Sequence, residues 1–227
     1  MTQTKIRSLQ TTMPNADGWM LVADTWTYAS ATAVTVPSGA ALLYAVGDKI
    51  RLKQGATYKY FYVTAVADTL LTVTGGSDFT VATPTAITDV YYSKVATPVG
   101  FPQWFNYAPY GISATNVTLL GRFCVNGRIC SFQFVANFTG GITFTTMPSL
   151  PILSSSNIIG TRYGLSGLAG YIEAGVAEHP CGLQLEIHNN TPLFILETFN
   201  TVTEISATSP ITWKSGDTIE AAGSYEI

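Results

Sequence analysis

His179, Cys181 and His188 are the residues whose side-chain types and spacing come nearest to a catalytic or metal-binding set. A cysteine hydrolase needs an imidazole within hydrogen-bond range of the thiolate, and neighbours along a strand do not give this because they face opposite ways. His179 and Cys181 share a face if their segment is extended, and with His188 they form three potential metal ligands. The His-x-Cys spacing lacks the paired signature of zinc modules. We therefore predict no catalytic residues, no metal site and no cofactor.

Carboxylates offer a second route to chemistry, because a glycosidase needs two of them across a cleft. Each candidate lies among residues predicted to form strands, where a glutamate on the solvent-facing side needs no catalytic role. The candidates are Glu173, Glu178, Glu186, Glu197, Glu204 and Glu220. The sequence singles out no pair. Carboxylate separation is a property of the folded chain, so an enzyme that degrades polysaccharide remains an open alternative.

Aromatic side chains form the third group with a potential binding role. In residues 58–62, Tyr-Lys-Tyr-Phe-Tyr, one whole strand face is tyrosine. Aromatic residues dominate both cores and interfaces, so packing in one or the other is the expected role of each. The tyrosine ribbon is the first candidate for an assembly surface. The full set of candidate assembly or binding residues is Tyr58, Tyr60, Tyr62, Trp104, Phe105 and Trp213.

The composition favours strands that meet other subunits. Only 11% of the 227 residues are charged, against about 25% in ordinary soluble domains. Thr, Ser, Ala and Gly take the place of the missing charges. Neutral hydroxyl and β-branched side chains fit a pleated surface and do not repel a neighbouring copy, so we expect shared subunit surfaces.

Charge and hydropathy exclude other classes of protein. The formal net charge is −3 and the Lys and Arg residues are scattered, so we expect no nucleic-acid binding. No run approaches the roughly eighteen apolar residues of a membrane span. Residues 1–10 lack the apolar stretch of a secretion signal. We expect a soluble protein made in a cytoplasm, without insertion into a membrane.

Sequence patterns typical of β-strands occur along nearly the whole chain, so the candidate side chains are expected to lie on strands. No segment keeps an apolar stripe of helical spacing over three turns. Residues 49–53 alternate strictly between charged and apolar types, which predicts a half-buried strand with one solvated face. Residues 58–66 follow Gln54-Gly55 as the partner strand of a hairpin. In the second half, strands are predicted at 118–125, 128–138, 158–163, 168–176, 182–188, 193–198, 201–207 and 217–226.

Asn126-Gly127 predicts a two-residue hairpin turn with Val125 opposite Arg128. Cys124 and Cys130 then point to opposite sides of the ribbon, so we predict no disulfide between them. The predicted core face of this hairpin carries Phe123, Val125, Cys130, Phe132 and Phe134. The other face, which is solvated or meets another subunit, carries Arg122, Cys124, Ser131 and Gln133.

Gly-Asp precedes a predicted strand in both halves, at Gly47-Asp48 and at Gly216-Asp217. Glycine accepts a positive φ, and the aspartate carboxylate can accept hydrogen bonds from turn amides. We interpret both as turn-to-strand devices rather than as a repeat or a site.

The fold class predicted from these elements is all-β. A small N-terminal β-barrel or sandwich at 19–94 follows an arm at 1–18. A stiff proline- and aromatic-rich linker at 95–109 leads to an antiparallel jelly-roll β-sandwich at 110–227.

Two stretches carry a family resemblance. The sequence VGDKIRLKQG at 46–55, continued through 57–63 to TPVGFPQWF at 97–105, resembles a module of phage and prophage structural proteins of the tail or fibre type. The second half, from GRFCVNGR at 121–128 to GSYEI at 223–227, is similar to the trimeric jelly-roll heads of phage receptor-binding proteins. Those heads resemble complement-type and tumour-necrosis-factor-like domains. The resemblance implies a homotrimeric virion component with no catalytic residues to carry over.

Three functional hypotheses follow. The first is a tail-fibre or receptor-binding protein, fixed by its N-terminal unit to other virion proteins and meeting a host-surface carbohydrate or protein through a C-terminal trimeric knob. The second is a capsid decoration protein or head fibre. The third is a virion-associated polysaccharide depolymerase. In each case the expected location is the virion, after synthesis in the host cytoplasm.

Overall fold

The computed structural model describes residues 16–109, 111, 115–141, 149–152, 165–188, 191–198, 208–209 and 211–227, with the backbone alone for 165–166, 182–188 and 191–198. The chain divides into two compact units. Residues 1–105 and 125–128 form unit 1, and residues 106–124 and 129–227 form unit 2. The division after Phe105 lies inside the proline-rich segment 95–109. Both units are built from antiparallel strands, as the sequence predicts.

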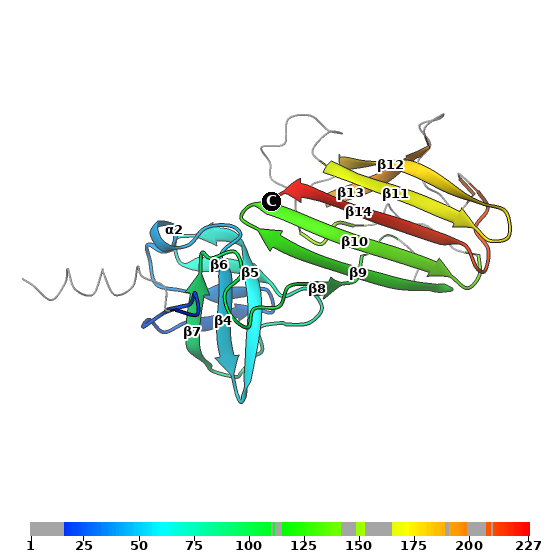
Figure 1. Cartoon of the computed structure of the whole chain (residues 1–227). Coiled ribbons are helices and arrows are strands. Elements are labelled where there is room, and N and C mark those ends of the chain that lie inside the picture. The colour runs from blue at the N-terminus through cyan, green and yellow to red at the C-terminus, as the bar shows by residue number, and fades with distance from the viewer. Residues whose placement is uncertain are drawn as a thin grey trace, which may run out of the picture. The chain divides into compact units, whose positions relative to one another are not determined.

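Unit 1 is a seven-stranded sheet with one short helix (Figure 1). The strand order is β1-β7-β4-β5-β6-β3-β2, and Figure 1 labels β4, β5, β6, β7 and α2. Its elements are β1 (Met20–Leu21), β2 (Thr27–Ser30), β3 (Ala33–Thr35), α2 (Ala40–Leu43), β4 (Lys49–Gln54), β5 (Thr57–Ala67), β6 (Leu70–Thr74) and β7 (Ile87–Ser93).

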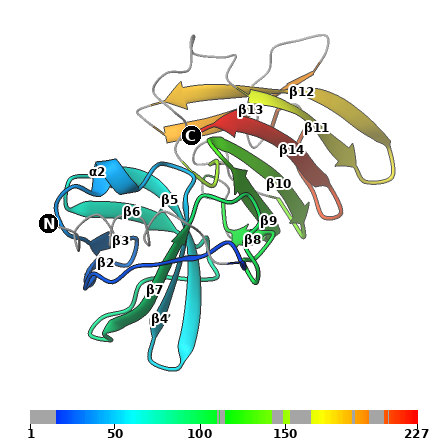
Figure 2. The ribbon, with the colours of Figure 1, turned by 60° about the vertical axis from the view of Figure 1, so that its left-hand side comes forward.

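Strand β5 links the two halves of this sheet. Its first half pairs with β4, where Gln54 lies opposite Thr57 across the predicted hairpin. Its second half pairs with β6, with a bulge between Val63 and Ala65. Figure 2 shows β4 and β7 beside one part of β5, and β6, β3 and β2 beside the other. The described strands leave β1 and β2 as separate edges, so unit 1 is an open sheet and the predicted barrel closure is not found.

The core of unit 1 lies on the inner face of this sheet. Ile50, Leu52 and Phe61 are fully buried there, together with side chains from every other strand but β2. The outer face of β4 differs from its prediction, because Lys49 is only 3% exposed and Arg51 and Lys53 are half-buried. The alternation correctly assigned the two faces, but the charged face is buried at Lys49 and only partly solvated at Arg51 and Lys53.

Unit 2 is built on six long strands with the short β8 at one edge, in the order β13-β12-β11-β14-β10-β9-β8. The last strand inserts between β10 and β11, which are far earlier in the chain. The predicted strands 158–163 and 201–207 lie outside the described residues. The elements are β8 (Phe105–Tyr107), β9 (Val117–Asn126), β10 (Ile129–Phe138), β11 (Leu165–Glu173), β12 (Ala177–His188), β13 (Thr191–Thr198) and β14 (Thr218–Glu226).

The β9–β10 hairpin turns one residue later than predicted. β9 ends at Asn126 and β10 begins at Ile129, so Gly127 and Arg128 form the turn. Gly127 has φ 59 and Arg128 does not have a positive φ, which fits a turn with glycine at its first central position. Moving the turn by one residue changes each cross-strand partner by two, so every side chain keeps its predicted face.

The two faces of unit 2 follow the predicted alternation. On β10 the buried residues are Cys130, Phe132, Phe134, Ala136 and Phe138, and Phe123 and Val125 on β9 are also buried. This inner face is covered in part by the chain itself. The Tyr225 hydroxyl lies 2.8 Å from the Ile152 carbonyl oxygen and 3.1 Å from its amide nitrogen.

Both Gly-Asp pairs form the predicted turn. The Ala45 amide donates to Asp48 Oδ2 at 2.9 Å, and the Lys214 amide donates to Asp217 Oδ2 at 2.8 Å. Asp217 also accepts from the Ala174 amide through Oδ1 at 2.9 Å. The carboxylate in each case holds the turn that starts the next strand.

The backbone bonds around the two pairs are also the same. Gly47 and Gly216 have φ 89 and 92. Their amides donate to the carbonyl groups of Val63 and Phe138, at 2.9 and 2.8 Å. The amides of Val63 and Phe138 donate back to the carbonyl oxygens of the two aspartates. The same Gly-Asp turn, with the same hydrogen bonds, therefore occurs in both units.

Candidate binding sites

The predicted tyrosine ribbon forms part of a larger surface on the outer side of β7, β4 and β5. We call it the aromatic face. Cross-strand register places Tyr62 opposite Lys49, Tyr60 opposite Arg51 and Tyr58 opposite Lys53. The aromatic face consists of Trp19, Lys49, Arg51, Lys53, Tyr58, Tyr60, Tyr62, Tyr91, Phe101 and Phe105.

One end of the aromatic face is covered by the segment that leads out of unit 1. The Phe101 ring packs against Tyr60 and Tyr62 with ring centroids 5.9 and 5.0 Å apart. Phe105 lies 5.2 Å from Tyr62. As a result Tyr62 and Phe105 are buried, at 2% and 0% exposure. Phe101 and Phe105 of the predicted linker are thus part of the packing of unit 1.

The buried end contains the Lys49 ammonium. Its Nζ lies 5.6 Å from the Tyr62 ring centroid and 5.9 Å from that of Phe101. Burial lowers the pKa of Lys49, and the neighbouring Asp48 carboxylate opposes this shift. Burial raises the pKa of Asp48, whose carboxylate lies 3.4 Å from Lys94 Nζ. This end is packed interior rather than a binding surface.

The open end is organised around Arg51. Its guanidinium carbon lies 4.2 Å from the Tyr91 ring centroid, 4.7 Å from that of Trp19 and 5.3 Å from that of Tyr58. Tyr58 is 38% exposed, and Leu21 next to Tyr91 is 55% exposed. An arginine stacked on aromatic rings keeps the donors in its plane available for a ligand.

A bulge in β7 sets this arrangement. Lys53 pairs with Thr88 and Arg51 with Tyr91, so two residues of β7 lie opposite one residue of β4. Asp89, in the bulge, has φ 45, and its carboxylate lies 3.5 Å from Lys53 Nζ. Bulges re-aim side chains, and here the extra residue brings Tyr91 against the guanidinium. No sequence signal identified this bulge.

The six residues predicted to form an assembly or binding surface therefore divide into two groups by the burial of their side chains. Tyr58 is exposed and Tyr60 and Trp104 are half-buried, so these three retain surface. Tyr62, Phe105 and Trp213 are buried within the chain, so they are corrected to packing residues. Trp213 lies in unit 2, with its ring 5.1 Å from Phe138 and 5.7 Å from Tyr171.

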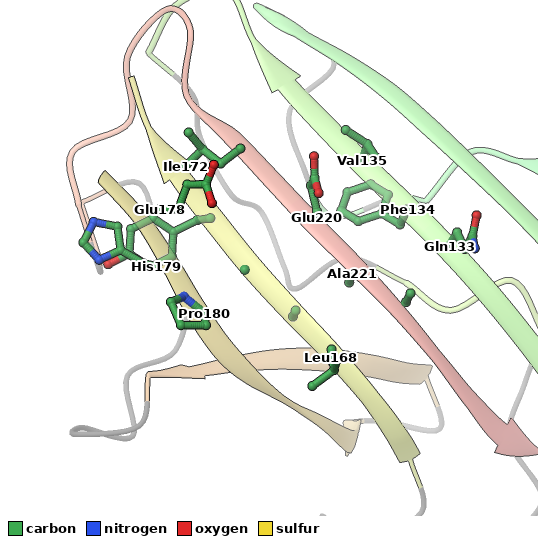
Figure 3. Close-up of a pocket in the computed structure, with 14 residues that line it drawn as sticks. Gln133, Phe134, Val135, Leu168, Ile172, Glu178, His179, Pro180, Glu220 and Ala221 are labelled. Atoms are coloured by element: carbon green, nitrogen blue, oxygen red, sulfur yellow. The ribbon is translucent and has the colours of Figure 1, made fainter. Parts of the chain in front are cut away.

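A second candidate site is an open groove of about 660 Å³ on the outer face of unit 2, over β10, β14, β11 and β12. Figure 3 shows Glu178, Glu220, Ile172 and Val135 along it. Gly170 lies between Glu220 and Pro180 in the strand register. Two of the six glutamates considered from the sequence thus line one groove, which strand pattern alone does not reveal.

The histidine and cysteine set does not form a shared site in the described residues. The His179 ring stacks on Tyr171 with centroids 4.4 Å apart, and its Nε2 is buried without a hydrogen-bond partner. The Cys181 thiol faces the His179 carbonyl oxygen at 3.5 Å, and the side chain of His188 is not described. Among the described side chains no three His, Cys, Asp or Glu gather as metal ligands.

Comparison with protein-family models, curated proteins and solved structures gives no match. The described part of the chain contains no helix that is long and apolar enough to cross a membrane. The resemblance to phage structural proteins therefore stays a prediction from the residues that carry it.

Proposed function

We propose that this chain is a structural protein of a phage virion, of the tail-fibre or receptor-binding type, which assembles as a homotrimer and binds a ligand on the host surface. Unit 2 is the proposed trimeric jelly roll. The insertion of β14 between β10 and β11 supports this, because a return strand beside an early strand is typical of Greek-key sandwiches. Unit 1 is the proposed attachment to other virion proteins.

The observation that carries the proposal is the outer face of unit 2. Leu120, Ile129 and Leu168 are 59%, 46% and 77% exposed on this face. Between them lie mainly neutral residues, such as Ser131 and Ala222. A second copy can approach a surface of this kind without desolvating many charges, because apolar and neutral groups cost little to bury.

Light scattering after size exclusion tests the assembly. At micromolar concentration we expect a species of three times the 24.3 kDa chain mass. A monomer at this concentration would contradict the proposal. Imaging the chain within its particle distinguishes a tail location from the alternative of a capsid decoration protein or head fibre.

A depolymerase is the second candidate, and the groove containing Glu178 and Glu220 favours it over other enzymes. Both side chains are exposed on an open face, as expected of solvated carboxylates, so we rank this candidate below assembly. The test is incubation with host polysaccharide and measurement of new reducing ends. New ends with the native protein, but not with Glu178→Gln or Glu220→Gln, would establish the enzyme.

A further inference from the structure

We infer that the open end of the aromatic face is a binding site for an acidic saccharide, with Arg51 as the group that pairs with the sugar carboxylate. This inference rests on the host-surface ligand of the proposed function and names its chemical class, and it gives unit 1 a ligand site in addition to its proposed role in attachment. The site itself lies within unit 1 and needs no second copy of the chain.

The first argument is the state of the Arg51 donors. No described residue accepts a hydrogen bond from this guanidinium or forms an ion pair with it. Its Nε is buried and has no hydrogen-bond partner among the residues that the structure describes. Arg51 is only partly buried, and a guanidinium presents its terminal N–H groups in the spacing that matches a carboxylate.

The second argument is that the nearby acid is already engaged. Asp89 pairs with Lys53 at 3.5 Å, and the two side chains are 48% and 33% exposed. This leaves Arg51 as the cation without a carboxylate at the open end. Its guanidinium carbon lies over the Tyr91 and Trp19 rings, and contact with both rings restricts the positions of its donors before a ligand arrives.

The third argument is the apolar surface that flanks the cation. The exposed Tyr58 ring and the exposed Leu21 side chain lie on two sides of the Arg51 and Tyr91 pair. A small inorganic anion would use the guanidinium alone. A sugar ring that carries a carboxylate would also cover part of this apolar surface with its C–H groups, and its hydroxyl groups would remain in water.

Methyl glucuronide and methyl glucoside form a matched pair of probes, because they differ in the carboxylate. Binding is followed by NMR titration of the Arg51 Nε–Hε signal in the full chain, with sodium acetate as a third ligand. We expect saturable shifts with methyl glucuronide, with a dissociation constant on the order of 1 mM. We expect methyl glucoside and acetate to bind at least about tenfold more weakly.

Variants separate the roles of the residues. Arg51→Lys keeps the charge but loses the planar fork, so its affinity for methyl glucuronide, followed through backbone amides of β4 and β7, is expected to fall about tenfold. Tyr58→Ala is expected to weaken glucuronide binding while leaving acetate binding unchanged. Arg122→Lys, the same replacement in unit 2, is the matched control and should bind as the native chain does.

Each result decides the inference. Equal binding of glucuronide and acetate would reduce the site to an adventitious anion site, and equal binding of glucoside would remove the role of the carboxylate. Unchanged binding by Arg51→Lys would also overturn the inference. The mass of the same samples is measured by light scattering, so a monomer that binds glucuronide would contradict the trimer but not this site.

Discussion

The cationic residues of β4 show how a side chain's surroundings change its chemistry. Lys49, Arg51 and Lys53 share one strand face, yet only the last two keep contact with solvent. Lys49 is desolvated beneath Tyr62 and Phe101. Arg51 lies over aromatic rings and is partly exposed. Neighbours along one strand can thus serve as packing and as a binding group.

Lys49 gives a pH-dependent prediction. Because its pKa is lowered in the folded chain from an ordinary 10.5, the unfolded chain holds the proton to higher pH. The contribution of Lys49 to stability therefore rises with pH from the folded pKa up to 10.5. Urea unfolding from pH 7 to 10 should show the native chain gaining free energy of unfolding relative to Lys49→Met. A difference that is constant with pH would contradict this prediction.

The buried thiols give a second prediction. Burial raises the pKa of Cys130 to about 12 and also raises that of Cys181. The reactive thiolate is therefore scarce at both positions, and neither sulfur is accessible. Mass spectrometry should show iodoacetamide modifying Cys130 and Cys181 at pH 8 only after unfolding in urea. Rapid modification of either one in the folded protein would be the contrary result.

At the scale of elements, the Gly-Asp turn explains how each unit starts a strand beside another strand of its sheet. The carboxylate binds the amide three residues before it, and the backbone pairs with a strand from the same sheet. Asp217 is fully buried and also holds the Ala174 amide of the β11–β12 turn. One side chain therefore joins two turns in unit 2.

Replacing Asp217 should be costly. Asp217→Ala removes both hydrogen bonds and leaves two amides unpaired, so we expect a loss of about 2–4 kcal/mol in the free energy of unfolding. Asp217→Asn keeps an acceptor for one amide and should lose less. Chemical denaturation measures both, with the exposed Asp24→Ala in unit 1 as a matched aspartate control. Equal stability of Asp217→Ala and the native chain would show that water replaces the carboxylate.

At the scale of the whole molecule, the question is which exposed surface joins the copies. The outer face of unit 2 offers exposed Leu168 beside neutral neighbours. Unit 1 also has an exposed leucine, Leu42 on α2, at 89% exposure. Of these two leucines, only Leu168 belongs to the proposed trimer surface.

Leu168→Glu should separate the subunits. Carboxylates placed on a contact surface must be desolvated when copies associate, so we expect at least about tenfold weaker assembly. Leu42→Glu introduces the same charge in unit 1 and should leave assembly unchanged. Light scattering over a dilution series measures both, and circular dichroism checks that the fold is retained. A trimer that tolerates Leu168→Glu would place the interface elsewhere.

The sequence by itself determined the all-β class and which side chains share a face of a predicted strand. Side chains alternate with period two along a strand, so Phe132 and Phe134 had to share a face opposite Gln133, even though the turn began one residue later than predicted. The sequence also determined the Gly-Asp turns. Their glycines need a positive φ, and their carboxylates reach amides close by in the chain.

Only the tertiary structure decided what lies over each face. Strand pattern groups Arg51 with Lys49, but it does not show that Phe101 and Phe105 cover one end and leave the other open. Nor does it show the bulge that brings Tyr91 against Arg51. Such contacts depend on how distant segments pack, whereas alternation is a property of a single strand. The candidate site is therefore a product of the fold.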